Sequence, residues 1–147
     1  MSKYYFVMLI IVMSFMSSCS QLARILDPDK KPASSRNDVY VYTAYDSTGN
    51  VCAKGKLYFN NPDSSHFTGT WDIQAFKPTT QIGPQDGNGT FVGNRVDSEV
   101  QIDLSPNWRD NNVILIGTET GDKITGEWMW VTFIGPTSKG AFTLVSK

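Results

Sequence analysis

Glycine occurs inside most of the strand-like segments of this chain, and this feature limits the possible folds more than any other. From Asp38 onward, short runs of β-branched and aromatic residues alternate with turns of Gly, Pro, Asn and Asp, a pattern typical of strands joined by turns. The glycines inside these runs are Gly55, Gly69, Gly93, Gly117 and Gly126. Because an interior glycine weakens a strand, it is used where a sheet bends or its strands crowd together. We therefore expect a sheet that curls throughout.

Eight runs are predicted to form strands. They span residues 39–45, 51–59, 66–76, 89–96, 99–104, 113–118, 124–133 and 141–146. Their short connections favour antiparallel pairing of consecutive strands. Eight strands can close on themselves, which leaves either a filled core or room for one small ligand. The predicted fold is thus an all-β, eight-stranded antiparallel up-and-down β-barrel over residues 38–147, and the alternative is a sandwich of two sheets.

Alternation of apolar and polar residues within the runs predicts which side chains face inward. In the second run, Val51 and Leu57 share the apolar face, and Cys52 lies with two lysines on the other face. The residues expected mostly inside are Val39, Val51, Leu57, Phe67, Trp71, Ile102, Leu104, Trp128 and Phe142.

Four strand phrases, FTGTWDI, VQIDL, NVILIG and ITGEWMW, resemble those of the calycin group, which includes lipocalins, fatty-acid-binding proteins and avidins. The resemblance extends over residues 38–147 and implies a barrel with an aromatic-lined ligand pocket. Trp71, Trp128 and Trp130 would line that pocket and offer their indole N–H groups as polar contacts. The alternative is that these rings only fill the core, as inward side chains of small barrels commonly do.

The first twenty residues have the pattern of a targeting signal. Lys3 precedes an apolar stretch, residues 4–16, which at 13 residues is shorter than the roughly 20 that span a bilayer but fits a secretory signal. The sequence MSSC that follows, ending at Cys19, resembles the lipobox of bacterial lipoproteins. The resemblance implies removal of residues 1–18, acylation of Cys19 and anchoring in the bacterial cell envelope, at the outer membrane because Ser20 rather than Asp comes next. A simple secretory signal is the alternative.

Residues 19–37 are predicted to form a lipidated N-terminus and a flexible tether. Pro28 and Pro32 interrupt this segment, and charged and serine residues fill much of it, so it is hard to pack. As a flexible coil, residues 20–37 would span roughly 20–25 Å. Two or more acyl chains on Cys19 would make attachment to a membrane stable.

Charge and residue types argue against several functional classes. The net charge of −1 and the lack of a basic cluster do not favour nucleic-acid binding. His66, the one histidine, lies beside Asp63 and two serines in a short loop, whereas a catalytic triad needs groups that converge from separate elements. A metal site would need more histidine, cysteine or convergent carboxylates, and Cys52 is expected to be a packing residue. We therefore expect neither enzyme activity nor a cofactor.

Loop placement predicts where a partner would bind. In an up-and-down barrel alternate loops lie at one end, and the first, third, fifth and seventh loops include the two longest. These loops are residues 46–50, 77–88, 105–112 and 135–139. Trp108 and Arg109 belong to this set, and an aromatic residue beside arginine is typical of an interface anchor. The alternative is that Trp108 folds down and plugs the barrel.

The sequence thus predicts a lipid-anchored, non-enzymatic envelope barrel that binds a small apolar ligand or an envelope protein through its loop-rich end. A packed core would favour the protein, and an open cavity would favour the small ligand. Small barrel inhibitors of lysozymes and proteases are similar in size and architecture. The alternative function is therefore an inhibitor that inserts residues 105–112 into the cleft of a hydrolase.

Overall fold

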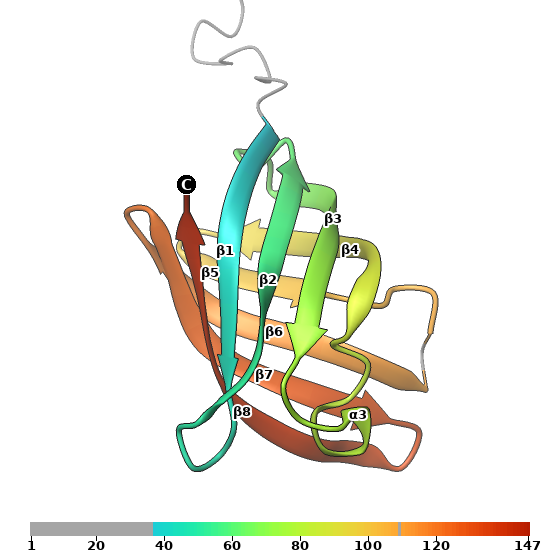
Figure 1. The fold of residues 1–147 in the computed structure, drawn as a ribbon. Helices are drawn as coiled ribbons and strands as arrows, with labels where there is room; N and C mark the ends of the chain where they lie inside the picture. Colours follow the sequence, from blue (N-terminus) through green and yellow to red (C-terminus); the bar gives the residue numbers. More distant parts are fainter. Residues whose placement is uncertain (1–36, 109) are drawn as a thin grey trace, which may run out of the picture. The chain divides into compact units, whose positions relative to one another are not determined.

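Eight antiparallel strands close into a barrel (Figure 1). This computed structural model describes residues 37–108 and 110–147. The strands are β1 (Asn37–Tyr45), β2 (Val51–Asn60), β3 (His66–Ala75), β4 (Gly87–Val96), β5 (Glu99–Asp103), β6 (Asn111–Thr120), β7 (Lys123–Thr132) and β8 (Gly135–Ser146). Each strand pairs with the next along the chain, and β8 pairs with β1 to complete the circle. The predicted up-and-down barrel is confirmed, and the two-sheet sandwich is excluded.

A single helical turn, α3 (Thr79–Ile82), lies in the connection between β3 and β4. Pro78 stands at its N-terminal boundary, and Gly83 ends it with a φ of 72°, in the left-handed region that favours glycine. Within the part of the chain that the structure describes, no helix is long and apolar enough to cross a membrane.

Some of the glycines inside the strands lie where a side chain would collide with the backbone of the neighbouring strand. A Cβ atom at Gly55 would lie 2.1 Å from the carbonyl oxygen of Asp72, and one at Gly126 would lie 2.0 Å from that of Ile116. No side chain fits at such distances without moving the backbone. The prediction that these glycines mark a curled and crowded sheet is therefore confirmed.

Inward aromatic rings occupy the space that other glycines leave free. In four cross-strand pairs the ring of one residue lies against the position of a glycine Cβ: Phe67 with Gly93, Phe91 with Gly69, Trp71 with Gly89, and Trp128 with Gly140. A Cβ atom at Gly93 would lie 2.1 Å from the Phe67 ring, and one at Gly89 would lie 2.7 Å from the Trp71 ring. Each ring thus lies over bare backbone of the adjacent strand, an arrangement that stabilises glycine within sheets.

These rings belong to one continuous core. Near the start of β1, the aromatic side chains pack in pairs with ring centroids 4.6–6.3 Å apart. This aromatic cluster consists of Tyr40, Phe59, Phe67 and Phe91. The Arg95 guanidinium packs against this cluster, with its central carbon 5.4 Å from the Phe67 ring centroid. Its Nε also lies 2.8 Å from Glu119 Oε2, so the cation is paired with a carboxylate.

The inward face of β1 differs from the prediction. Val39 is only half-buried, whereas the buried residues of this strand are Tyr40, Tyr42 and Ala44. The two tyrosines face inward because the interior offers ring partners for both and a hydrogen-bond acceptor for the Tyr42 hydroxyl. The prediction for Val39 was therefore wrong.

A β-bulge reverses the alternation at the start of β2. Tyr45 pairs with Val51, but Ala44 pairs with the residue two positions further along β2. Cys52 therefore has no partner residue in β1 and turns inward. As a result Cys52 is buried and Val51 is only half-buried, which is the opposite of the predicted faces. The other predicted core residues are buried: Leu57, Phe67, Trp71, Ile102, Leu104, Trp128 and Phe142.

The last strand is longer than predicted. β8 begins at Gly135, so residues 135–139, which were expected to form a loop, instead continue the ladder with β7. The ladder includes a bulge after Trp130, where Val131 pairs with Pro136. The connection between β7 and β8 consequently shrinks to residues 133–134.

Candidate functional site

The two ends of the barrel differ in their connections. One end, here called the loop-rich end, carries residues 46–50, 76–86, 104–110 and 133–134. The other, the plain end, carries residues 61–65, 97–98 and 121–122 together with the start of β1. The predicted asymmetry is confirmed, although the seventh connection is a tight turn.

The connection 76–86 folds into the loop-rich end and closes it. Ile82 joins the hydrophobic core, and Gln85 is fully buried. The Tyr42 hydroxyl donates a 2.7 Å hydrogen bond to Gln85 Oε1, and Gln85 Nε2 donates a 2.7 Å bond to the Ile82 carbonyl. Because both ends of this buried amide are paired inside the barrel, the connection forms a plug rather than an open mouth.

Two further contacts fasten the plug to the last strands. The Trp130 ring lies so close to Gly83 that a Cβ atom there would come within 2.5 Å of it. The Ser138 hydroxyl donates a 2.7 Å hydrogen bond to the Gln81 carbonyl. The plug is thus held by the core, by β1 and by β7 and β8 together.

The three predicted pocket tryptophans all use their indole N–H groups within the protein. Trp71 donates to the Leu104 carbonyl at 2.7 Å, Trp128 to the Tyr45 carbonyl at 2.8 Å, and Trp130 to Asn111 Oδ1 at 2.7 Å. All three acceptors stand where a strand meets a loop of the loop-rich end. The indoles therefore tie these loops to the barrel wall, and their N–H groups are already engaged.

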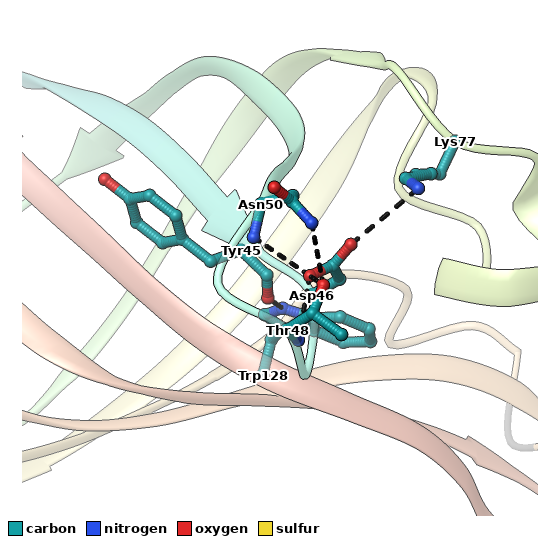
Figure 2. Close-up of polar contacts among 6 residues, drawn as sticks. All are labelled: Tyr45, Asp46, Thr48, Asn50, Lys77 and Trp128. Carbon is teal, nitrogen blue, oxygen red and sulfur yellow. Dashed lines mark hydrogen bonds and ion pairs between the residues drawn. The ribbon is translucent and has the colours of Figure 1, made fainter.

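The turn after β1 is organised around one carboxylate (Figure 2). Asp46 Oδ1 accepts hydrogen bonds from the Thr48 hydroxyl at 2.7 Å, the Thr48 backbone N–H at 2.9 Å and the Asn50 backbone N–H at 3.0 Å. Lys77 Nζ lies 3.8 Å from Asp46 Oδ2 and links the turn to the plug. These donors, the Thr48 hydroxyl first, lower the pKa of Asp46. The first loop is therefore a fixed turn.

Trp108 stands on the surface of the loop-rich end. Its side chain is 70% exposed, so the alternative in which it plugs the barrel is wrong. It borders a hollow of about 200 Å³, which is lined by Trp71, Asn88, Gly89, Thr90, Leu104, Ser105, Pro106, Asn107 and Trp108. Arg109, its predicted companion, lies outside the described residues, as do Cys19 and the tether before Asn37.

Other large apolar side chains are exposed at the same end. Phe133 and Ile134 form the tip between β7 and β8 and are 83% and 79% exposed. Phe76, at the start of the plug connection, is also exposed. This tip was not predicted from the sequence, because residue 133 was placed inside a strand. The signal that could have found it is Gly135, whose φ of 108° permits the chain to reverse there.

Cys52 and His66, which are expected to lack catalytic roles, each have a defined environment. Burial raises the pKa of the Cys52 thiol, which disfavours the thiolate that a nucleophile requires. His66 Nδ1 lies 2.6 Å from Asn94 Oδ1. Within residues 37–108 and 110–147, no three His, Cys, Asp or Glu side chains group in a way that could hold a metal ion.

A scan against protein-family models finds no match to this chain, and searches of curated proteins and of solved structures find none either. The function is therefore inferred from the chain's own residues.

Removing the Tyr42 hydroxyl tests the plug. We expect Tyr42→Phe to lower the free energy of unfolding by about 1–3 kcal/mol, because the buried Gln85 oxygen loses its donor. Urea unfolding followed by tryptophan fluorescence measures this change. Tyr58→Phe, at an exposed ring on the outer face, is the matched control and should alter stability by less than about 0.5 kcal/mol. Equal effects of the two substitutions would contradict the role of the plug.

Proposed function

We propose that this chain is a lipid-anchored, non-enzymatic barrel of the bacterial cell envelope that binds a protein partner through its loop-rich end. The observation that carries the proposal is the group of exposed apolar side chains at that end. They are Phe76, Trp108, Phe133 and Ile134. Large apolar and aromatic side chains exposed at one end of a barrel favour a protein interface there, because burying them against a partner removes apolar surface from water.

The state of the interior favours a protein over a small apolar ligand. The aromatic rings lie over glycines and the plug closes the loop-rich end. The hollow beside Trp108, at about 200 Å³, is smaller than the roughly 300–1,000 Å³ of typical small-molecule pockets. It is suited to receive one side chain from a partner.

The lipid anchor rests on the lipobox-like sequence that ends at Cys19. β1 begins at the plain end, so a tether that ends at Asn37 enters the barrel opposite the loop-rich end. A flexible tether of residues 20–37 would hold the barrel within roughly 20–25 Å of the bilayer. Attachment at the plain end leaves the exposed loops free to meet a partner.

The alternative, an inhibitor of a hydrolase, is favoured by the hydrogen bonds that hold residues 104–108. The Leu104 N–H donates to the Val113 carbonyl at 2.9 Å, and the Trp108 N–H donates to the Ser105 carbonyl at 2.9 Å. The Ser105 N–H is bonded to the side chains of Asp103 and Asn112. A braced loop with a protruding tryptophan loses little freedom when it enters a cleft, which is what a tight inhibitor needs.

Substitutions at the loop-rich end test partner binding. The full chain is crosslinked in intact envelopes, and the crosslinked species are quantified by mass spectrometry. We expect Trp108→Ala to reduce the amount of the specific partner about tenfold or more, as loss of an interface anchor does. Val96→Ser is the control, because Val96 is equally exposed but stands at the plain end. Unchanged crosslinking in Trp108→Ala and in Phe133→Ser would remove the loop-rich end as the binding surface.

The anchor is tested separately by replacing Cys19. We expect Cys19→Ala to move the protein from the membrane fraction to the soluble fraction, because the acylated residue is lost. Incorporation of radiolabelled palmitate should disappear in the same variant, while Cys52→Ala should retain both the label and the membrane association. Membrane association of Cys19→Ala at the wild-type level would exclude the lipid anchor.

A further inference from the structure

One strand of the barrel has a neighbour missing along half of its length. β4 pairs with β3 from Gly87 to Asn94, but it pairs with β5 only from Val92 to Val96. β5 ends at Asp103, and the chain then leaves the wall as the connection 104–110. Residues 87–91 of β4 therefore have a strand on one side only.

The direction of the backbone groups follows from the antiparallel ladder, in which successive residues point alternately to the two neighbours. The Arg95 N–H donates to the Ser65 carbonyl, on the β3 side. Odd-numbered residues of β4 thus face β3, and even-numbered residues face β5. Asn88 and Thr90 consequently present their N–H and C=O groups to the side where β5 is missing.

No hydrogen bond from the described part of the chain reaches these four groups. The nearest segment on that side is the connection 104–110, whose backbone bonds run elsewhere. The Leu104 N–H is bonded to Val113 in β6, and the Ser105 N–H is bonded to two side chains. The Leu104 carbonyl accepts from the Trp71 indole. The open stretch of β4 is therefore an unpaired sheet edge within the wall of the barrel.

The hollow beside Trp108 lies along this edge. Its lining joins Asn88, Gly89 and Thr90 on one side to the start of the connection 104–110 on the other, with Trp71 between them. The side chains of Asn88, Thr90 and Asn107 make no hydrogen bond within the described chain. None of the described lining residues is charged. The edge and the hollow together offer backbone groups for a strand and a recess, lined by uncharged residues in the described part of the chain, for one side chain.

We infer that this edge binds an extended peptide segment of the protein partner by strand addition. The segment pairs its backbone with Asn88 and Thr90, which supplies the ladder that β5 leaves unfinished. One of its uncharged side chains enters the hollow toward Trp71, and Trp108 covers it. An extended backbone is the chemistry that matches alternating N–H and C=O groups in a row. The inference rests on the proposed function and names the part of the partner that is recognised.

The test uses the full chain in mild detergent and a phage-displayed library of random dodecapeptides as the probe. Enriched peptides are synthesised, and their affinities are measured by calorimetry against wild type, Thr90→Pro and Val96→Ser. Proline at position 90 removes the N–H that faces the open side and leaves the ladder with β3 intact. We expect Thr90→Pro to bind about tenfold or more weakly, and the plain-end control Val96→Ser to bind like wild type.

A second measurement does not depend on the folding of Thr90→Pro. Each peptide residue is N-methylated in turn, and affinity for wild type should fall at every second residue, because only alternate N–H groups face β4. Amide exchange of Asn88 and Thr90 should slow when the peptide is added. Failure to enrich any peptide, or a loss of affinity without this alternation, would overturn the inference.

The crosslinking experiment separates this inference from the proposed function. If Trp108→Ala loses the partner and a folded Thr90→Pro keeps it, the loop-rich end binds the partner without strand addition, and the inference fails alone. If both variants keep the partner at wild-type levels, the proposed function fails as well. Loss of the partner in both variants supports the two together.

Discussion

The close approach of aromatic rings to bare glycine backbone is the interaction on which the rest of this structure depends. Where Phe67 lies over Gly93 and Trp71 lies over Gly89, the ring fills the volume that a side chain of the neighbouring strand would occupy. The strands can therefore curl tightly enough to close, and the interior is filled by the same rings. The same ring–glycine contacts thus allow the sheet to close and fill its interior.

A filled interior leaves the rim of the barrel as the surface on which the proposed function depends. The interior is occupied by rings, and Gln85 of the plug is bonded to Tyr42 inside the wall. The loops at that end are fixed by indole N–H bonds and by the Asp46 turn (Figure 2). On this rigid frame the exposed apolar side chains of Trp108, Phe133 and Ile134 project outward. Such preorganisation lowers the entropy lost on binding, so a small surface can support a specific complex.

The strand number, the antiparallel order and the closure could be predicted because turns and interior glycines are local features of the sequence. Most of the inward-facing residues could be predicted from the alternation of apolar and polar residues along the strands. The errors arose where a distant partner decides the outcome. Cys52 faces inward because of a bulge, Tyr42 because the plug offers an acceptor, and residues 135–139 pair because β7 is beside them. The plug and the open edge at Asn88 and Thr90 depend on how the loops pack against the barrel and on where β5 ends. The alternation of residues along a strand does not determine either feature.

A double-mutant cycle on Phe67 and Gly93 tests the role of these pairs most directly, because the three atoms nearest to a Cβ atom at Gly93 all belong to the Phe67 ring. Urea unfolding would be measured for Gly93→Ala in wild type and in Phe67→Leu. Gly93→Ala should cost about 1–3 kcal/mol in wild type, as overpacking does, and at least about 1 kcal/mol less when the ring is absent. The same cost in both backgrounds would show that the ring does not require the glycine, and would contradict this account of the barrel.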